Sequence, residues 1–166
     1  MNEIIIGNVC SLFAMISDAI SGTRKKNSEI LAIQIISQIF YGTGSFVLKG
    51  YSSVVQNVVG ILRNLAGIKD IKNKFIEWTL ILLGVILGII FNNRGLLGYL
   101  PILGNLEYSI AIFRFKDNEK GLKISFIINM IVFSSFNFVI MNYVSGVANF
   151  ITALTTAISL IRENKK

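Results

Sequence analysis

The sequence predicts an all-α membrane protein in which seven transmembrane helices form two parallel triple-helix bundles joined by a linker helix. Three observations lead to this fold class. Hydrophobic residues make up 53% of the 166 residues and charged residues only 15%, whereas soluble domains carry about 25% charged residues. Long apolar stretches follow one another along the chain, separated by short polar segments. Part of the first half also recurs, weakly, in the second half.

Each apolar stretch is long enough to cross a bilayer, which takes about 17 to 25 helical residues. The last two stretches must be separate helices, because one helix from Leu122 to Ile161 would be about 60 Å long, twice the hydrocarbon thickness. The chain is therefore expected to turn back at Asn142. The predicted spans are Ile4–Ile20, Ile30–Leu48, Tyr51–Ile68, Phe75–Phe91, Leu96–Phe113, Leu122–Met141 and Tyr143–Ile161.

Cations are distributed unevenly between the two ends of these spans. If the N-terminus is outside, all but two of the 16 lysines and arginines lie near the cytoplasmic ends, and only Lys49 and Arg94 lie near the outer ends. Basic loops remain on the cytoplasmic side of a membrane. The sequence thus predicts a membrane protein with its N-terminus outside and its C-terminus in the cytoplasm. The net charge of +7 is assigned to orientation and not to nucleic-acid binding.

The internal repeat divides the chain into units. The segment YSSVVQNVVGIL from Tyr51 and the segment YVSGVANFITAL from Tyr143 share five identities at a constant offset of 92 residues. Because three helices reverse the direction of insertion, a fourth returns the second unit to the orientation of the first, as in transporters with parallel repeats. Residues 1–68 and 95–166 are the predicted bundles and residues 69–94 the linker helix with its loops. Gly84 and Gly88 in the linker span favour close helix packing.

Polar side chains inside the spans point to a binding site, because such groups usually face a bundle interior or a cavity. Gln34, Ser37, Gln38 and Tyr41 have the spacing of one helical face. Asn57 and Asn149 lie at matching depths in the third helix of each unit. Carboxamides, with two donors and an acceptor, suit a small neutral polar solute better than an ion. The predicted substrate-binding residues are Asn57, Asn149, Gln56, Gln38, Tyr41, Asn105 and Asn129.

Two intramembrane acids allow several interpretations. Asp18 lies one turn inside the first basic loop, where Arg24 or Lys25 is expected to neutralise it in a structural salt bridge or a gate. Glu107 lies about twelve residues into its span and is a candidate proton site, since burial favours the protonated carboxyl. Glu107 can equally stay neutral and hydrogen-bonded, or pair with Arg94.

Enzyme, metal and cofactor chemistry find little support in the sequence. Histidine is absent, Cys10 is the single cysteine, and no glycine-rich phosphate loop or zinc-ligand spacing is present. The sequence therefore predicts no enzymatic activity, no cofactor and no metal site.

Two segments carry a resemblance to a known family. GNVCSLFAMISDAISGTRKK from Gly7 and QIISQIFYGTGSFVLKGYSSVVQNVVGILRN from Gln34 resemble the YgjV-type bacterial inner-membrane proteins. The predicted layout is also similar to the SWEET sugar facilitators and the PnuC vitamin-precursor transporters. In SWEET-type proteins an asparagine on the third helix of each bundle lines the pocket, and Asn57 and Asn149 lie on the matching helices. Pro101 is the only proline, so paired proline hinges are absent.

These observations predict a membrane facilitator of a small neutral polar solute, sugar-like or vitamin-precursor-like, that works by alternating access between the two repeats. Its partners are the lipid bilayer and the solute, and association into homo-oligomers is left open. The alternative is a non-transporting scaffold or accessory protein, in which the amides only join helices at about 0.6 kcal/mol each.

Overall fold

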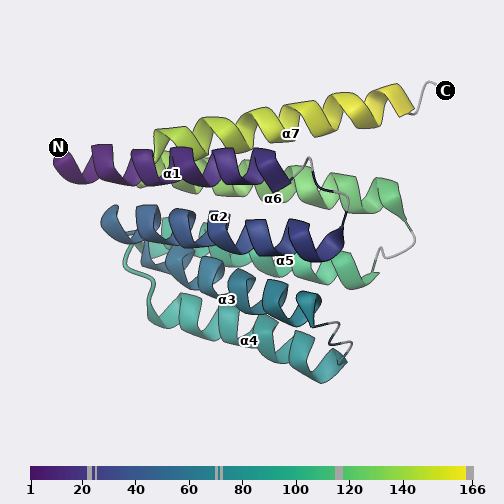
Figure 1. Ribbon diagram of the computed structural model, residues 1–166. Coiled ribbons are helices and arrows are strands. Elements are labelled where there is room, and N and C mark those ends of the chain that lie inside the picture. Colours follow the sequence, from purple (N-terminus) through teal and green to yellow (C-terminus); the bar gives the residue numbers. More distant parts are fainter. Residues whose placement is uncertain (22–23, 25, 70, 72, 115–117, 164–166) are drawn as a thin grey trace.

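The computed structural model describes residues 1–21, 24, 26–69, 71, 73–114 and 118–163 (Figure 1). Within these residues all regular secondary structure is helical, with seven α-helices and one short 3₁₀ helix, η1. The elements are α1 Asn2–Ser21, α2 Asn27–Val47, α3 Tyr51–Ile68, α4 Lys74–Ile90, η1 Gly95–Tyr99, α5 Leu100–Arg114, α6 Glu119–Val139 and α7 Tyr143–Glu163.

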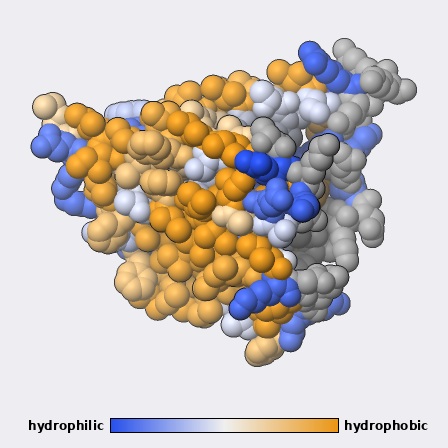
Figure 2. Space-filling view, viewed as in Figure 1, coloured by the Kyte–Doolittle hydropathy of each residue, from blue (hydrophilic) through white to orange (hydrophobic). Residues whose placement is uncertain are grey.

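The seven α-helices match the seven predicted spans, with ends that differ by a few residues. Four of them are long and apolar enough to cross a membrane, in the ranges Asn2–Ser21, Ser28–Val47, Lys120–Val139 and Tyr143–Arg162. The chain is therefore an all-helical, multi-pass membrane protein. Large apolar side chains are exposed along the helices, and Figure 2 shows them as a broad hydrophobic surface with polar residues gathered toward its two ends.

The fifth predicted span is divided, which the sequence did not predict. The 3₁₀ turn η1 occupies Gly95–Tyr99, and α5 begins only at Leu100. Pro101 lies in the first turn of α5, where its missing N–H has no intrahelical partner in any case. The 15 residues of α5 are about 22 Å long, and the five residues of η1 add about 10 Å, so together they match the hydrocarbon thickness.

Six helices form a closed ring, and the seventh lies outside it. The helices contact one another in the ring order α1, α2, α3, α5, α6, α7 and back to α1, while α4 packs on α3 and α5 (Figure 1). Gly84 and Gly88 are buried on the face of α4 that meets the ring. A Cβ on Gly88 would come within 2.8 Å of Ile102 and 2.9 Å of the Gln56 side chain. The predicted role of these glycines in close packing is thus confirmed.

The corner between α2 and α3 has the same backbone geometry as the corner between α6 and α7, 92 residues later. Leu48 N donates to Gly44 O and Gly50 N to Ser45 O, as Ile140 N donates to Phe136 O and Asn142 N to Asn137 O. The turn predicted at Asn142 is confirmed, since α6 ends at Val139 and α7 begins at Tyr143.

A small apolar core fills the ring at the end where these two corners lie. It consists of the buried Leu48, Phe136 and Ile140, with Ile4 and Leu100 packed against them. Gly7 allows the Leu48 side chain to approach α1, because a Cβ there would lie 2.5 Å from Leu48 Cγ. Side chains from α1, α5 and α6 and from the α2 and α6 caps therefore seal this end of the ring.

Candidate functional site

A polar cavity lies inside the helix ring. Its volume is about 810 Å³, within the roughly 300–1,000 Å³ of small-molecule sites, and α1, α2, α3, α5, α6 and α7 all contribute lining residues. Asparagine, glutamine and serine side chains dominate the lining from α2 and α3. The site is therefore built by elements from both ends of the chain, with α4 excluded from its wall.

All seven predicted substrate-binding residues line this one cavity. They come from five helices: Gln38 and Tyr41 from α2, Gln56 and Asn57 from α3, Asn105 from α5, Asn129 from α6 and Asn149 from α7. Asp18 of α1 lines the cavity as well. The polar residues that the sequence marked in separate spans thus meet in one place.

The two ends of the cavity differ. Toward the corner end its lining includes the buried Ser45, Ser53 and Asn137, next to the apolar core of Leu48, Phe136 and Ile140. At the opposite end, where α1 ends and α2 begins, the lining residue Ala19 is exposed. Among the described residues, the lining is therefore buried at the corner end and partly exposed at the other.

Three of the amides join helices to one another. Gln56 Nε2 donates to Gly84 O of α4 (2.9 Å), and Asn105 Nδ2 of α5 donates to Gln56 Oε1 (2.6 Å). Asn129 Nδ2 of α6 donates to Gly104 O of α5 (2.6 Å). Gln56 and Asn129 are also buried. These hydrogen bonds stabilise the wall of the cavity by joining α3, α4, α5 and α6.

Other amides keep more of their hydrogen-bonding capacity for the cavity. Asn57 Nδ2 donates only to Ser53 O of its own helix (2.8 Å). Gln38 Oε1 is buried and has no hydrogen-bond partner within the described residues. Asn149 is half-buried and lines the cavity opposite the α2 and α3 wall. No hydrogen bond joins Asn57 to Asn149 in the described part of the chain.

The acids have polar partners other than the expected cations. Asp18 is hydrogen-bonded by the Ser37 and Tyr41 side chains, while Arg24 is exposed and Lys25 lies outside the described residues. Glu107 Oε1 accepts a hydrogen bond from Ser125 Oγ (2.7 Å), and Glu107 Oε2 is buried without a partner among the described atoms. Glu107 faces α6 and is not part of the cavity lining.

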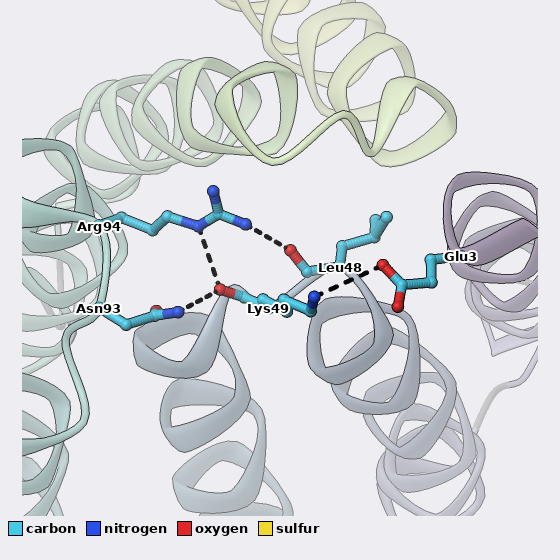
Figure 3. A network of polar contacts seen from close by, with 5 residues as sticks. All are labelled: Glu3, Leu48, Lys49, Asn93 and Arg94. Atoms are coloured by element: carbon cyan, nitrogen blue, oxygen red, sulfur yellow. Dashed lines mark hydrogen bonds and ion pairs between the residues drawn. The ribbon is translucent and has the colours of Figure 1, made fainter. Parts of the chain in front are cut away.

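The proposed pair of Glu107 with Arg94 is wrong, because Arg94 binds the corner between α2 and α3. Its Nη2 donates to Leu48 O (2.7 Å) and its Nε to Lys49 O (3.1 Å), and Asn93 Nδ2 also donates to Lys49 O (2.8 Å). Figure 3 shows this cluster, with the exposed ion pair of Lys49 and Glu3 beside it.

Asn8 holds the other corner. Its Nδ2 donates to Met141 O (2.9 Å), and its Oδ1 accepts from Val144 N (2.9 Å). Asn8 lies in the first helix of the first predicted unit and Asn105 in the first helix of the second, but of these two residues only Asn105 lines the cavity. The two asparagines therefore have different roles.

Sequence reasoning missed several lining residues. Arg63 was counted only among the cations near the cytoplasmic ends of the spans, although it precedes the end of α3 by more than a turn, and Tyr108 was not among the predicted site residues. Tyr108 packs on Phe126 of α6 with ring centroids 5.6 Å apart, and both line the cavity. The α6 face of Phe126, Met130 and Phe133 is as regular as the polar face of α2, so its spacing was a usable signal.

Comparison with known proteins agrees with this architecture. Residues 5–166 match the family model Imp-YgjV, described as "Bacterial inner membrane protein". No curated protein and no solved structure matches the chain significantly, and the similarity to SWEET and PnuC transporters is not confirmed. Since the match covers nearly the whole sequence, the chain belongs to the Imp-YgjV family of bacterial inner membrane proteins.

Proposed function

We propose that the protein is a facilitator of a small neutral polar solute, which binds in the cavity inside the helix ring. The observation that carries the proposal is the convergence of polar side chains from six helices on one cavity of about 810 Å³. Polar groups are costly in hydrocarbon, so a lined cavity of this size is expected to serve a solute.

The proposed mechanism is alternating access between two parallel triple-helix units, α1–α3 and α5–α7, with α4 as the linker. Support comes from the matching corners at an offset of 92 residues and from the ring order, in which α3 meets α5 as α7 meets α1. In this scheme the observed form is open toward the end where α1 ends and α2 begins. The uneven cation distribution assigns that end to the cytoplasm and the N-terminus to the outside.

Within the site, we assign solute contact to Gln38, Asn57 and Asn149, whose amides bond to no other helix in the described part of the chain, and to Tyr41, which lines the cavity beside Asp18. Gln56, Asn105 and Asn129 are assigned a supporting part, because they already bind neighbouring helices. No step in this scheme requires a covalent reaction, a metal or a cofactor. Proton coupling through Glu107 is not part of the proposal, because Glu107 lies outside the cavity lining.

The competing proposal is a non-transporting scaffold. The observation that favours it is that Gln56, Asn105 and Asn129 each bond to another helix, as pure helix-joining residues do. The two proposals differ on Asn149 and Gln38. A scaffold gives no reason for these two amides to face a cavity that is open to the surface.

Solute entry into proteoliposomes tests the proposal. Osmotic swelling of vesicles that contain the purified protein is followed for a panel of uncharged polyols, sugars, amides and nucleosides. The expected result is faster entry of at least one solute than into protein-free vesicles, reduced at least tenfold by Asn57→Leu/Asn149→Leu. Asn73→Ala, which changes an exposed helix cap, is the matched control. Equal entry in vesicles with and without protein, for every solute, would overturn the proposal in favour of the scaffold.

A further inference from the structure

The two halves of the chain line the cavity with different chemistry. At the repeat offset of 92, both members of several residue pairs line the cavity, and in four pairs the first half contributes a polar side chain and the second an apolar one. These pairs are Gln34 and Phe126, Gln38 and Met130, Tyr41 and Phe133, and Gln56 and Ala148. The cavity is therefore nearly symmetric in backbone but asymmetric in polarity.

The apolar side chains form one face of α6. Phe126, Met130 and Phe133 are at positions i, i+4 and i+7, the spacing of one helical face, and Gln34, Gln38 and Tyr41 have the same spacing on α2. In the ring, α2 and α6 are separated by α3 and α5 on one side and by α1 and α7 on the other. The polar face of α2 thus lies across the cavity from the Phe126, Met130 and Phe133 side chains of α6, beside which Asn129 and Asn137 also line the cavity.

We propose that the cavity takes a planar heterocycle with an amide-type edge, of the nucleobase kind. Its flat face lies against α6 and its hydrogen-bonding edge points toward α2 and α3. This inference rests on the proposed function and specifies the class of its solute. A side-chain carboxamide presents a donor and an acceptor next to each other, so it can form two parallel hydrogen bonds with such an edge, as Asn and Gln do with adenine.

Gln38 lines the cavity and has an unused acceptor that this edge can satisfy. Its Oε1 is a buried acceptor with no donor among the described residues, and a ring N–H supplies one. Gly60 makes room for the amide, because a Cβ there would lie 2.6 Å from Gln38 Nε2. The Gln38 carboxamide is thus held against the backbone of α3 at the cavity wall, and its buried Oε1 has to turn toward the cavity to accept a hydrogen bond from the solute.

The apolar wall selects against solutes that are polar on all sides. A linear polyol would place hydroxyl groups against Phe126, Met130 and Phe133, where they would lose hydrogen bonds to water and gain none. A planar ring offers a face without polar groups. Tyr108 and Phe126, tilted by 52° with centroids 5.6 Å apart, form an aromatic corner on which such a face can stack.

Ligand-dependent thermal unfolding of the purified full-length protein tests the inference. Adenine and uracil are compared at equal concentration with mannitol, which is polar on all sides, and with benzyl alcohol, which is flat but lacks an amide edge. We expect the nucleobases to raise Tm and mannitol to leave it unchanged, with benzyl alcohol weaker than either base. Gln38→Met is expected to weaken nucleobase binding about tenfold, and Phe126→Leu about threefold or more.

Thr43→Ala is the matched control, since Thr43 is an exposed residue of α2 outside the cavity lining, with its hydroxyl donating to Ile39 O, and its replacement should alter binding less than twofold. If Gln38→Met lowers the folded fraction, Phe126→Leu carries the test, because it keeps the wall apolar. Stabilisation by mannitol equal to that by the bases overturns this inference and leaves the proposed function intact. If the bases do not bind but another solute enters vesicles, the inference also fails and the proposed function again stands. If no compound binds and no solute enters, both fail.

Discussion

Lys49 and Met141, 92 residues apart, have the same left-handed backbone conformation, with φ of 57° and 61°. Each is the corner residue between two antiparallel helices, and each carbonyl oxygen accepts a hydrogen bond from an asparagine of a distant segment. Asn93 Nδ2 binds Lys49 O at 2.8 Å, and Asn8 Nδ2 binds Met141 O at 2.9 Å. Neither corner has glycine at this position, so the same strained geometry is kept by different residues in the two halves.

Relief of this strain should stabilise the protein. The left-handed conformation costs a non-glycine residue about 1–2 kcal/mol, whereas glycine adopts it freely. Met141 is 48% exposed, so its side chain contributes little packing. Met141→Gly is therefore expected to raise stability by about 0.5–1 kcal/mol, measured by thermal unfolding in detergent. Met141→Ala, which removes the same side chain without relieving the strain, should show no gain. An equal gain in both variants would contradict the explanation.

The Asn8 contact should be more important than its place near the chain terminus suggests. Asn8→Ala removes two hydrogen bonds that connect α1 with the corner between α6 and α7, and it leaves Met141 O and Val144 N without these partners. We expect a loss of about 1–2 kcal/mol in unfolding free energy. Thr43→Ala is the control, because that exposed hydroxyl bonds only to Ile39 O of its own helix. Similar losses in both variants would argue against a specific closure of the ring by Asn8.

The hydrophobicity of the sequence was enough to predict the helices, because the length of an apolar stretch determines whether it can span the bilayer. The turn at Asn142 followed from length as well, since Leu122 to Ile161 is too long for one helix. The division of the fifth span was not predicted. Its cause is the local conformation of Gly95, with φ of 56°, and the start of α5 beside Pro101, neither of which changes the average hydropathy.

The candidate site was predictable as a set of polar residues but not as a network. Helical spacing showed that Gln34, Gln38 and Tyr41 share a face of α2. It could not show that Asn105 would bond to Gln56, because this depends on the relative depth of α3 and α5. Arg94 illustrates the same limit, since its carbonyl partners at Leu48 and Lys49 are 46 and 45 residues away in the sequence.

Gly88 should be the less replaceable glycine of α4. A Cβ at Gly88 meets Ile102 at 2.8 Å and Gln56 Nε2 at 2.9 Å, whereas the nearest atom to a Cβ at Gly84 is Gln56 Oε1 at 3.3 Å. Gly88→Ala is expected to cost about 1–3 kcal/mol through overpacking, and Gly84→Ala less. Thermal unfolding of the two single variants provides the comparison. A larger loss for Gly84→Ala would show that α4 packs on the ring in another register.

Arg94 should tolerate lysine poorly although the charge is kept. The guanidinium donates to Leu48 O and Lys49 O at once, and a lysine ammonium cannot reproduce this planar pair of donors. Arg94→Lys is expected to lower stability by about 1–2 kcal/mol. Lys49→Ala removes only the exposed ion pair with Glu3 (3.7 Å), which is expected to change stability by less than about 0.5 kcal/mol. Equal effects in denaturant unfolding would mean that the exposed pair, and not the carbonyl contacts, holds this corner.

The apolar core at the corner end should act as the barrier that closes the cavity on that side. Phe136 is fully buried between Leu48 and Ile140, so Phe136→Ala leaves a gap that the side chains around it fill only in part.

A cysteine at Asn57, in a Cys10→Ser background, reports access from either side in sealed vesicles of both orientations. We expect a polar thiol reagent to label this cysteine from the side where α1 ends and α2 begins, and from both sides after Phe136→Ala. Phe138→Ala is the matched control, because Phe138 is 44% exposed and packs on Tyr143 outside the core. Labelling from both sides without Phe136→Ala would show that the core is not a barrier, and no labelling from either side would show that the cavity is not accessible.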